Sequence, residues 1–366
     1  MEKLEPPRRW LVIILTLLLS VGILFVAAES LVRLLVPKEI FWPISNIYQI
    51  VSTPGVSYTL KPRFQGTAFG VDLITNHLGF RGPEWSVEKP PSTFRIALLG
   101  DSHAFGYGVA FKDTVGEQLA KILNARGDRH YEVLNLAVSA YNSQQELAVL
   151  RAYALPYHPD LVIVIASSND DDPTPLVDQD GWLYSGMPLA TPKSPEIDKS
   201  IRKIQPITAF WLTKHSQLLL YFYLLKRKYQ LAQQSQSQRQ LPYPSVTPDC
   251  WLGPFPAGTI ADRLFQSVYL PLKTMIQEVK SAGIPIIMAN FNAILDYRQL
   301  FTHLAQEEQI PTLELLALFP EACSWAELLE QFGLGWNDHL NAAAHQRWAI
   351  ALADLIVKQG YLNAIK

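Results

Sequence analysis

The sequence has few cysteines and no large excess of either charge. Cys250 and Cys323 are the only two cysteines in 366 residues and do not form a CxxC motif, so a zinc site built from thiolates is not expected. The two can pair as a disulfide in an oxidising compartment or remain as thiols. The formal net charge is −2 and no dense block of Lys and Arg occurs, so nucleic acid is not an expected partner.

Charge is also missing from residues 10–28, WLVIILTLLLSVGILFVAA. At ~1.5 Å per residue, a helix of this length nearly crosses the hydrocarbon core of a membrane. Because Lys3, Arg8 and Arg9 precede the run, the amino terminus is expected in the cytoplasm and the rest of the chain on the extracytoplasmic side of the cytoplasmic membrane. The run is longer than the apolar core of a usual signal peptide. That length favours an uncleaved single-pass anchor over a signal sequence cleaved after Ala28.

The rest of the chain divides into segments of different composition. After the tip and anchor (1–37) comes a turn-rich, β-rich lead-in (38–92), then a larger domain (93–366) with an insertion (173–260). Strands are expected at 94–100, 131–138, 160–168, 284–290 and 311–316, and helices at 113–127, 143–157, 262–282, 296–308 and 341–358. This alternation predicts a parallel sheet in a three-layer α/β/α fold. A further helix at about 210–233 is expected to pack on the domain.

Polar residues gather where three of the expected strands end. GDSH (100–103), SAYN (139–142) and NDDD (169–172) each follow a strand, and GWNDHLNAAAH (335–345) precedes the last helix. The stretch from Ser143 to Glu146 fits a helical capping box. In open α/β sheets, ligands bind at the carboxyl ends of the strands. These clusters are therefore the candidate functional residues.

Ser102 has the setting of a nucleophile for acyl chemistry. A strand-to-helix turn exposes its hydroxyl, and such a serine needs a base and a carboxylate that orients the base. His339 and Asp338 can supply these two groups. The backbone N–H groups of Ser102 and Ala140 and the side-chain amide of Asn169 can hold the developing oxyanion.

The order of these blocks resembles the SGNH/GDSL hydrolase superfamily. The matching stretches are GDS with Ser102, NLAVSAYNSQQE, SSND with Asn169, and NDHLN with His339. The upstream ITNHLGFRGPE also looks like the lead-in of many membrane-anchored bacterial members. The resemblance implies a flavodoxin-like α/β/α fold and hydrolysis or transfer of esters without a cofactor. It also implies Ser as nucleophile, His as base, and Gly and Asn as oxyanion donors.

Two positions depart from the family pattern. Ala140 stands where the family has a glycine, which keeps the N–H but not the backbone freedom of glycine. The family's acid lies two or three residues before the histidine, whereas Asp338 directly precedes His339. Either the loop brings Asp338 to the imidazole, or Ser102 and His339 act as a dyad with Asn337 or a backbone carbonyl as acceptor.

Other motifs have less specific interpretations. GDSH also resembles the opening of metallophosphoesterases, but the GNH and GHxH motifs of those enzymes are missing, so no metal is expected. NDDDP is expected to be a solvated loop rather than a calcium site. His103 is a helix residue beside the site or a substrate contact. Arg81 faces the site rim or is a structural arginine, and His345 is expected on the surface.

The sequence therefore predicts a membrane-anchored serine esterase that acts on an O-acyl, for example O-acetyl, ester of a small molecule, lipid or carbohydrate. One alternative is an O-acetyltransferase acting on an extracellular polysaccharide. The other is a non-catalytic envelope protein that binds a glycan or a partner through the same cleft. The oligomeric state is not predicted.

Overall fold

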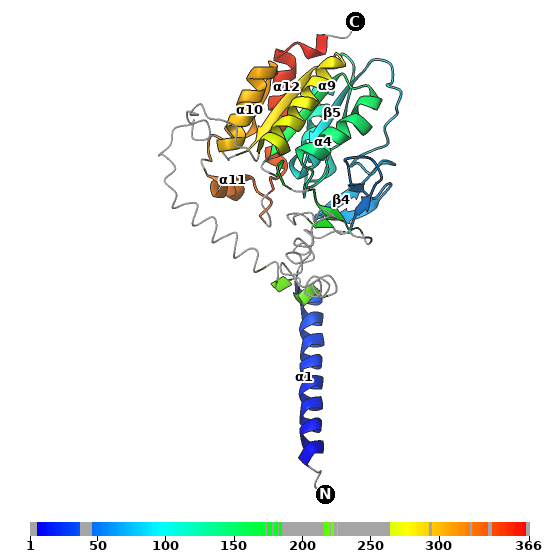
Figure 1. Ribbon diagram of the computed structural model, residues 1–366, viewed down its shortest axis with the longest axis vertical. Coiled ribbons are helices and arrows are strands. Elements are labelled where there is room, and N and C mark those ends of the chain that lie inside the picture. Colours follow the sequence, from blue (N-terminus) through cyan, green and yellow to red (C-terminus); the bar gives the residue numbers. More distant parts are fainter. Residues whose placement is uncertain are drawn as a thin grey trace. The chain divides into compact units, whose positions relative to one another are not determined.

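The computed structural model (Figure 1) describes residues 6–36, 46–167, 169–172, 174–177, 179, 181, 183–184, 216–219, 221–222, 225, 264–292, 295–322, 324–335 and 339–363. The chain forms two compact units. One contains residues 1–42 and 190–241, and the other contains residues 43–189 and 242–366. Asp338, Cys250 and Cys323 lie outside the described residues, as does most of the 173–260 insertion.

The second unit is built on a parallel sheet of five strands, in the order β11-β10-β7-β5-β6. The strands are β5 (Thr93–Gly100), β6 (His130–Asn135), β7 (Leu161–Ser167), β10 (Ile286–Phe291) and β11 (Thr312–Glu314). Every residue of β5, β7 and β10 is buried, as expected for strands covered on both faces. Counted along the chain, the order is 2-1-3-4-5, which is that of flavodoxin-like folds. The predicted fold class is confirmed.

Helices cover both faces of this sheet (Figure 1). On one face α3 (Val115–Asn124) packs against α12 (Ala342–Lys358), and on the other α4 (Ser143–Val149) packs against α9 (Leu270–Ser281). Right-handed crossovers account for this division, because the chain moves in opposite directions across the sheet after β5 and after β6. Further helices are α10 (Leu295–Glu308) and α11 (Trp325–Phe332), and α11 is an element that the sequence analysis did not predict.

The capping box at the start of α4 lies one residue earlier than predicted. Asn142, not Ser143, is the N-cap, and its side chain accepts the N–H of Gln145 while the Gln145 side chain accepts the N–H of Asn142. The shift turns Glu146 away from the capping position, and its side chain is buried.

The lead-in contributes two antiparallel pairs to the second unit, β1 (Tyr48–Ile50) with β2 (Tyr58–Leu60) and β3 (Gln65–Ala68) with β4 (Val71–Ile74). The first pair binds the loop after β6. The hydroxyl of Tyr58 donates to the carbonyl of Ser139 at 2.9 Å, and the hydroxyl of Tyr141 donates to the carbonyl of Tyr58 at 2.5 Å. Tyr58 of the lead-in thus bonds the residues before and after Ala140 in this turn.

The first unit contains α1 (Pro6–Leu35). Within the described residues this is the helix that is long and apolar enough to cross a membrane, with a mean hydropathy of 3.0 over its most apolar window. Its length and position fit a single-pass anchor or a signal sequence. The 210–233 segment, predicted as a helix on the α/β domain, is described only at a few residues. Three of these, Ser216, Gln217 and Leu218, form hydrogen bonds with the carboxylate of Glu29 in α1.

Candidate active site

Ser102 lies directly beyond the carboxyl end of β5, next to the point where the strand order reverses. Gly100 ends the strand with φ +147°, and a Cβ at this position would come within 2.6 Å of the Ala104 Cβ and 2.8 Å of the Ile165 carbonyl oxygen. Asp101 then caps the short helix α2 (Ser102–Phe105), because its carboxylate accepts the N–H of His103 at 2.9 Å. Glycine at the strand end and an acidic cap therefore place Ser102 at the first helical position.

His339 reaches Ser102 from the loop before α12. Its Nε2 lies 2.7 Å from the Oγ of Ser102. The loop is fixed on both sides: the carbonyl of His339 accepts the N–H of Leu334 at 3.0 Å, and Asn341 caps α12 while its own N–H donates to the carbonyl of Phe332 at 2.7 Å. A base within hydrogen-bond reach of a hydroxyl is the geometry that nucleophilic activation requires. The structure therefore brings together two residues that are 237 positions apart in the chain.

Aromatic rings pack around the imidazole of His339. The ring of Tyr107 stacks on it with centroids 4.5 Å apart, and the ring of His103 lies 4.9 Å away. His103 also contacts Phe291 and Trp348, so its ring lies beside the Ser102–His339 pair. Tyr107 was not singled out by that analysis, because no spacing rule connects the GYG stretch after the serine with a histidine near the carboxyl terminus.

Ala140 adopts a backbone conformation that normally favours glycine. Its φ is +64°, in the left-handed region where a Cβ is disfavoured by about 1–2 kcal/mol. The turn is held by Tyr58, which bonds the residues on either side of Ala140. Ala140 thus adopts a conformation that glycine would adopt without strain.

Asn169 is tied to the same turn and to the serine loop. Its Nδ2 donates to the carbonyl of Tyr141 at 3.2 Å. The Ser167 hydroxyl lies between the Oδ1 of Asn169 and the Oδ2 of Asp101, with 2.7 Å to the carboxylate. A short polar chain therefore links the Asn169 amide to the cap of the helix that carries Ser102. Ser167 belongs to the SSND stretch, in which only Asn169 was predicted to have a functional role.

Three buried carboxyl groups belong to the segments that carry Ser102, Ala140 and Asn169. Asp101, Glu146 and Asp170 are each 1% exposed. Burial, followed by repulsion from Asp170 and Asp101, raises the pKa of Glu146 well above its ordinary value. Burial and the charge of Asp101 likewise raise the pKa of Asp170. Neutral carboxyl groups at Glu146 and Asp170 relieve the repulsion that three buried charges would cause.

Two predicted positions need correction. Arg81 is not on the rim: it is 1% exposed, and its guanidinium donates to the carbonyls of Phe105, Gly106 and Val109 at 3.2, 2.7 and 2.6 Å. Through these hydrogen bonds, Arg81 stabilises the loop after Ser102. Burial lowers the pKa of Arg81 to about 10, so it remains charged at neutral pH.

His345 is buried rather than on the surface. It is 2% exposed, and its Nδ1 accepts the N–H of Val115 at 3.2 Å. Burial, with smaller contributions from the charges of His103, Arg81 and His339, lowers its pKa to about 3. The neutral ring joins α12 to the start of α3 and is a structural element of the core.

The described residues contain no candidate metal site. Within the ranges that the structure describes, no three His, Cys, Asp or Glu side chains are grouped so that they could hold a metal ion. Asp171 of the NDDDP stretch instead receives a hydrogen bond from the hydroxyl of Tyr297.

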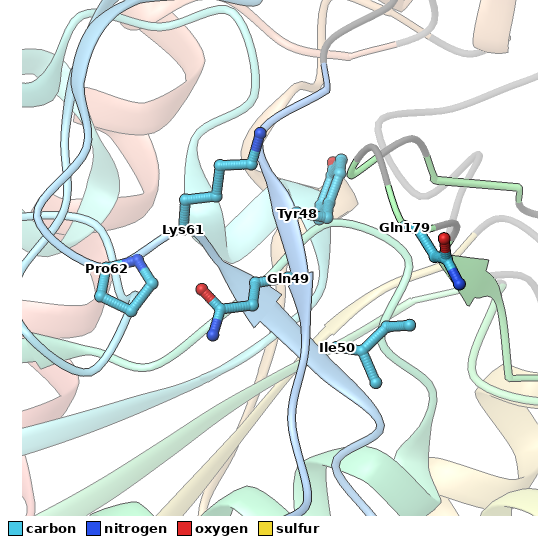
Figure 2. Close-up of a pocket in the computed structure, with 6 residues that line it drawn as sticks. All are labelled: Tyr48, Gln49, Ile50, Lys61, Pro62 and Gln179. Atoms are coloured by element: carbon cyan, nitrogen blue, oxygen red, sulfur yellow. The ribbon is translucent and has the colours of Figure 1, made fainter.

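A groove of about 570 Å³ runs along the lead-in strand pair (Figure 2). Its lining residues are Tyr48, Gln49, Ile50, Lys61, Pro62 and Gln179, none of which belongs to the predicted site. The amine of Lys61 is directed to the carbonyl of Asn46 at 2.6 Å. Neither Ser102 nor His339 lines this groove.

Most of the α/β domain matches a known protein family. Residues 98–347 match the model of the GDSL-like Lipase/Acylhydrolase family. A search of curated proteins found no match. One similar solved structure is a lipolytic protein of the G-D-S-L family from Desulfitobacterium hafniense, with 13% identity, a TM-score of 0.40, and coverage of 71% of this chain and 98% of that chain.

Two further solved structures show comparable similarity. A lipase/acylhydrolase from Enterococcus faecalis has 11% identity, a TM-score of 0.40, and coverage of 73% of this chain and 96% of that chain. An acetyl xylan esterase from Geobacillus stearothermophilus has 12% identity, a TM-score of 0.38, and coverage of 72% and 94%.

The parallel sheet and the family model, which spans more than half of the sequence, define the class of this domain. The chain belongs to the GDSL-like lipase/acylhydrolase family.

Proposed function

We propose that this chain is a serine esterase in which Ser102 attacks the carbonyl carbon of an O-acyl ester. The observation that carries the proposal is the 2.7 Å contact between the Oγ of Ser102 and the Nε2 of His339. As the Oγ–carbon bond forms, the hydroxyl proton passes to His339. Collapse of the tetrahedral intermediate expels the alcohol, which takes that proton, and water then hydrolyses the acyl-enzyme by the same route in reverse.

The oxyanion is held by three donors in this proposal. The N–H of Ser102 lies at the first position of α2, where no carbonyl of the helix can accept it. The left-handed turn at Ala140 presents a second N–H, and the amide of Asn169 supplies a third. The links from Asn169 to Tyr141 and, through Ser167, to Asp101 support a fixed amide orientation. Such preorganised donors stabilise the transition state more than the ground state.

The orienting group for His339 remains a prediction. Asp338 is the candidate, and the alternative is a Ser102–His339 dyad with Asn337 or a backbone carbonyl as acceptor. The stack of Tyr107 on the imidazole supports a ring orientation that does not depend on the acid alone.

We also propose that α1 anchors the chain in the cytoplasmic membrane with the catalytic unit outside. The support is the uncharged run of residues 10–28 behind Lys3, Arg8 and Arg9. The substrate is then an ester available outside the membrane, such as the O-acetyl ester of a carbohydrate. Transfer of the acyl group to a polysaccharide hydroxyl, in place of water, would follow from the same acyl-enzyme.

Hydrolysis of an aryl acetate by the full-length chain in detergent micelles tests the proposal. The Ser102→Ala and His339→Ala variants are expected to lose activity by a factor on the order of 10³ or more. Ser86→Ala, a change of the same size at an exposed position, should leave the rate unchanged. Equal rates for the parent chain and Ser102→Ala would reject the esterase and favour a non-catalytic binding protein. A soluble glycan acceptor added to the assay separates transfer from hydrolysis.

A further inference from the structure

Glu29, near the carboxyl end of α1, binds the start of a second helical segment within the same unit. Its carboxylate accepts the hydroxyl of Ser216 at 2.7 Å and the backbone N–H groups of Gln217 and Leu218, both at 3.0 Å. Ser216 in turn accepts the N–H of Leu219 at 3.2 Å. A carboxylate that caps the amino end of another helix is stabilised by hydrogen bonds and by the helix dipole. The second segment is therefore attached to α1 at a defined point.

The position of that point in a membrane follows from the helix geometry and rests on the proposed anchor. At the usual helical rise, α1 climbs about 28 Å from Trp10 to Glu29, which nearly equals the roughly 30 Å of a hydrocarbon core. Trp10 follows Arg8 and Arg9, and tryptophan prefers the membrane–water interface. Glu29 then lies at the opposite interface, and Ser216 with it.

The attached segment presents an apolar side to its surroundings. Leu218, Phe222 and Leu225 follow one another at helical spacing, and we call them the surface stripe. Phe222 is 59% exposed and Leu225 is 43% exposed. Leu31, Leu34 and Leu35 of α1, just beyond Glu29, are also exposed. Three basic residues, 226–228, follow the stripe in the sequence, a charge pattern that complements anionic lipid headgroups.

We propose that the surface stripe lies in the extracytoplasmic face of the membrane, so that the insertion carries a second, interfacial lipid contact held in place by Glu29. An apolar helical side at the level of the headgroups, followed by basic residues, is the pattern of a helix that lies on a bilayer. The contact restrains Ser216, Phe222 and Leu225 at the membrane surface.

Site-directed spin labelling of the full-length chain tests this contact. In a Cys250→Ser, Cys323→Ser background, single cysteines replace Phe222, Leu19 of the apolar run, or Val87, an exposed residue of the second unit. Each variant is labelled with a nitroxide and placed in vesicles of phosphatidylethanolamine and phosphatidylglycerol. Collision rates with oxygen, which concentrates in lipid, and with a water-soluble nickel complex are then compared.

The label at Phe222→Cys is expected to show an oxygen-to-nickel ratio several-fold above that at Val87→Cys. Adding Glu29→Ala should lower this ratio toward the aqueous value, whereas Glu88→Ala, at an exposed site, should not. An aqueous ratio at Phe222→Cys, or shielding from both reagents as under a protein partner, would overturn the proposal. If Phe222→Cys gives either of these results while Leu19→Cys shows a lipid signal, the interfacial contact is rejected and the anchor is retained. An aqueous signal at Leu19→Cys would reject the anchor as well, and neither result bears on the esterase assay.

Discussion

The ring of Tyr107 stacks on the imidazole of His339, with centroids 4.5 Å apart and 23° between the ring planes. The two residues are distant in the sequence, because Tyr107 lies in the loop after α2 and His339 in the loop before α12. The contact restrains rotation of the imidazole, whose Nε2 must face the hydroxyl of Ser102. An aromatic face also stabilises the imidazolium that forms when the serine proton is transferred.

Replacement of Tyr107 by leucine should therefore slow the chemical step. We expect kcat for aryl acetate hydrolysis to fall by about tenfold, the equivalent of ~1.4 kcal/mol of stacking energy, with little change in KM. Tyr107→Phe keeps the aromatic face and should retain most of the activity. An equal loss in both variants would show that the hydroxyl, rather than the ring stack, matters.

The left-handed backbone at Ala140 predicts that glycine is better tolerated there than alanine. Ala140→Gly should raise the free energy of unfolding by up to about 1 kcal/mol, since relief of the Cβ strain exceeds the added entropy of the unfolded chain. Urea denaturation followed by circular dichroism measures the change.

Ala110 offers a matched control for this substitution. It has a similar, intermediate exposure but an ordinary φ of −59°, so Ala110→Gly should lower the free energy of unfolding by roughly 0.5 kcal/mol. Destabilisation of the same size at both positions would contradict the strain assigned to Ala140.

Arg81 is expected to matter for stability more than for substrate binding. Arg81→Leu leaves the carbonyls of Phe105, Gly106 and Val109 without their donor, which should cost about 3 kcal/mol of unfolding free energy. Because Tyr107 lies on the same loop, kcat should fall in parallel. The control is Arg126→Leu at an exposed position, expected to change stability by less than ~0.5 kcal/mol. A higher KM with unchanged stability would contradict this and show that Arg81 contributes to substrate binding.

The buried carboxyl of Glu146 predicts a specific pH dependence. Its pKa is raised in the folded state, so the folded chain binds more protons than the unfolded chain once the pH exceeds the ordinary value of 4.5. The contribution of Glu146 to stability therefore falls as the pH rises above that value, by at most about 1.4 kcal/mol per pH unit, and levels off above the raised pKa.

Glu146→Gln removes this titration. The variant should lose less stability than the parent chain between about pH 5 and about pH 8, as measured by urea denaturation at several pH values. Glu88→Gln, at an exposed position, should follow the parent chain. Parallel pH curves for the parent and Glu146→Gln would show that Glu146 does not stay protonated in the folded state.

The sequence patterns predict the sheet well because local forces determine its strands. β7 is a nearly continuous apolar run, and β5 and β10 consist mainly of apolar residues. Such sequences indicate strands that are buried on both faces. Ser102 and Asn169 follow from the same logic, because polar residues at the carboxyl ends of parallel strands gather at one edge. His339 was predicted mainly by the resemblance, since the loop that carries it has no periodic pattern.

The incorrect predictions have different physical causes. His345 was placed on the surface, yet it lies on the buried face of α12 with Ala344, Trp348 and Leu352, a face that the helical period alone could have shown. The capping box moved by one residue because Asn142 competes with Ser143 for the N-cap. Arg81 and Tyr107 contact residues that are distant from them in the sequence. No local sequence pattern therefore indicates their roles.

Activation of Ser102 by His339 is the step on which the proposed esterase activity depends. Treatment of the full-length chain with a fluorophosphonate, followed by proteolysis and peptide mass spectrometry, tests it directly, because such reagents phosphonylate an activated serine hydroxyl. One adduct on Ser102 is expected in the parent chain, with strongly reduced labelling in His339→Ala and none in Ser102→Ala. No adduct on the parent chain, or labelling of Ser102 that is equally fast without the imidazole of His339, would contradict this activation.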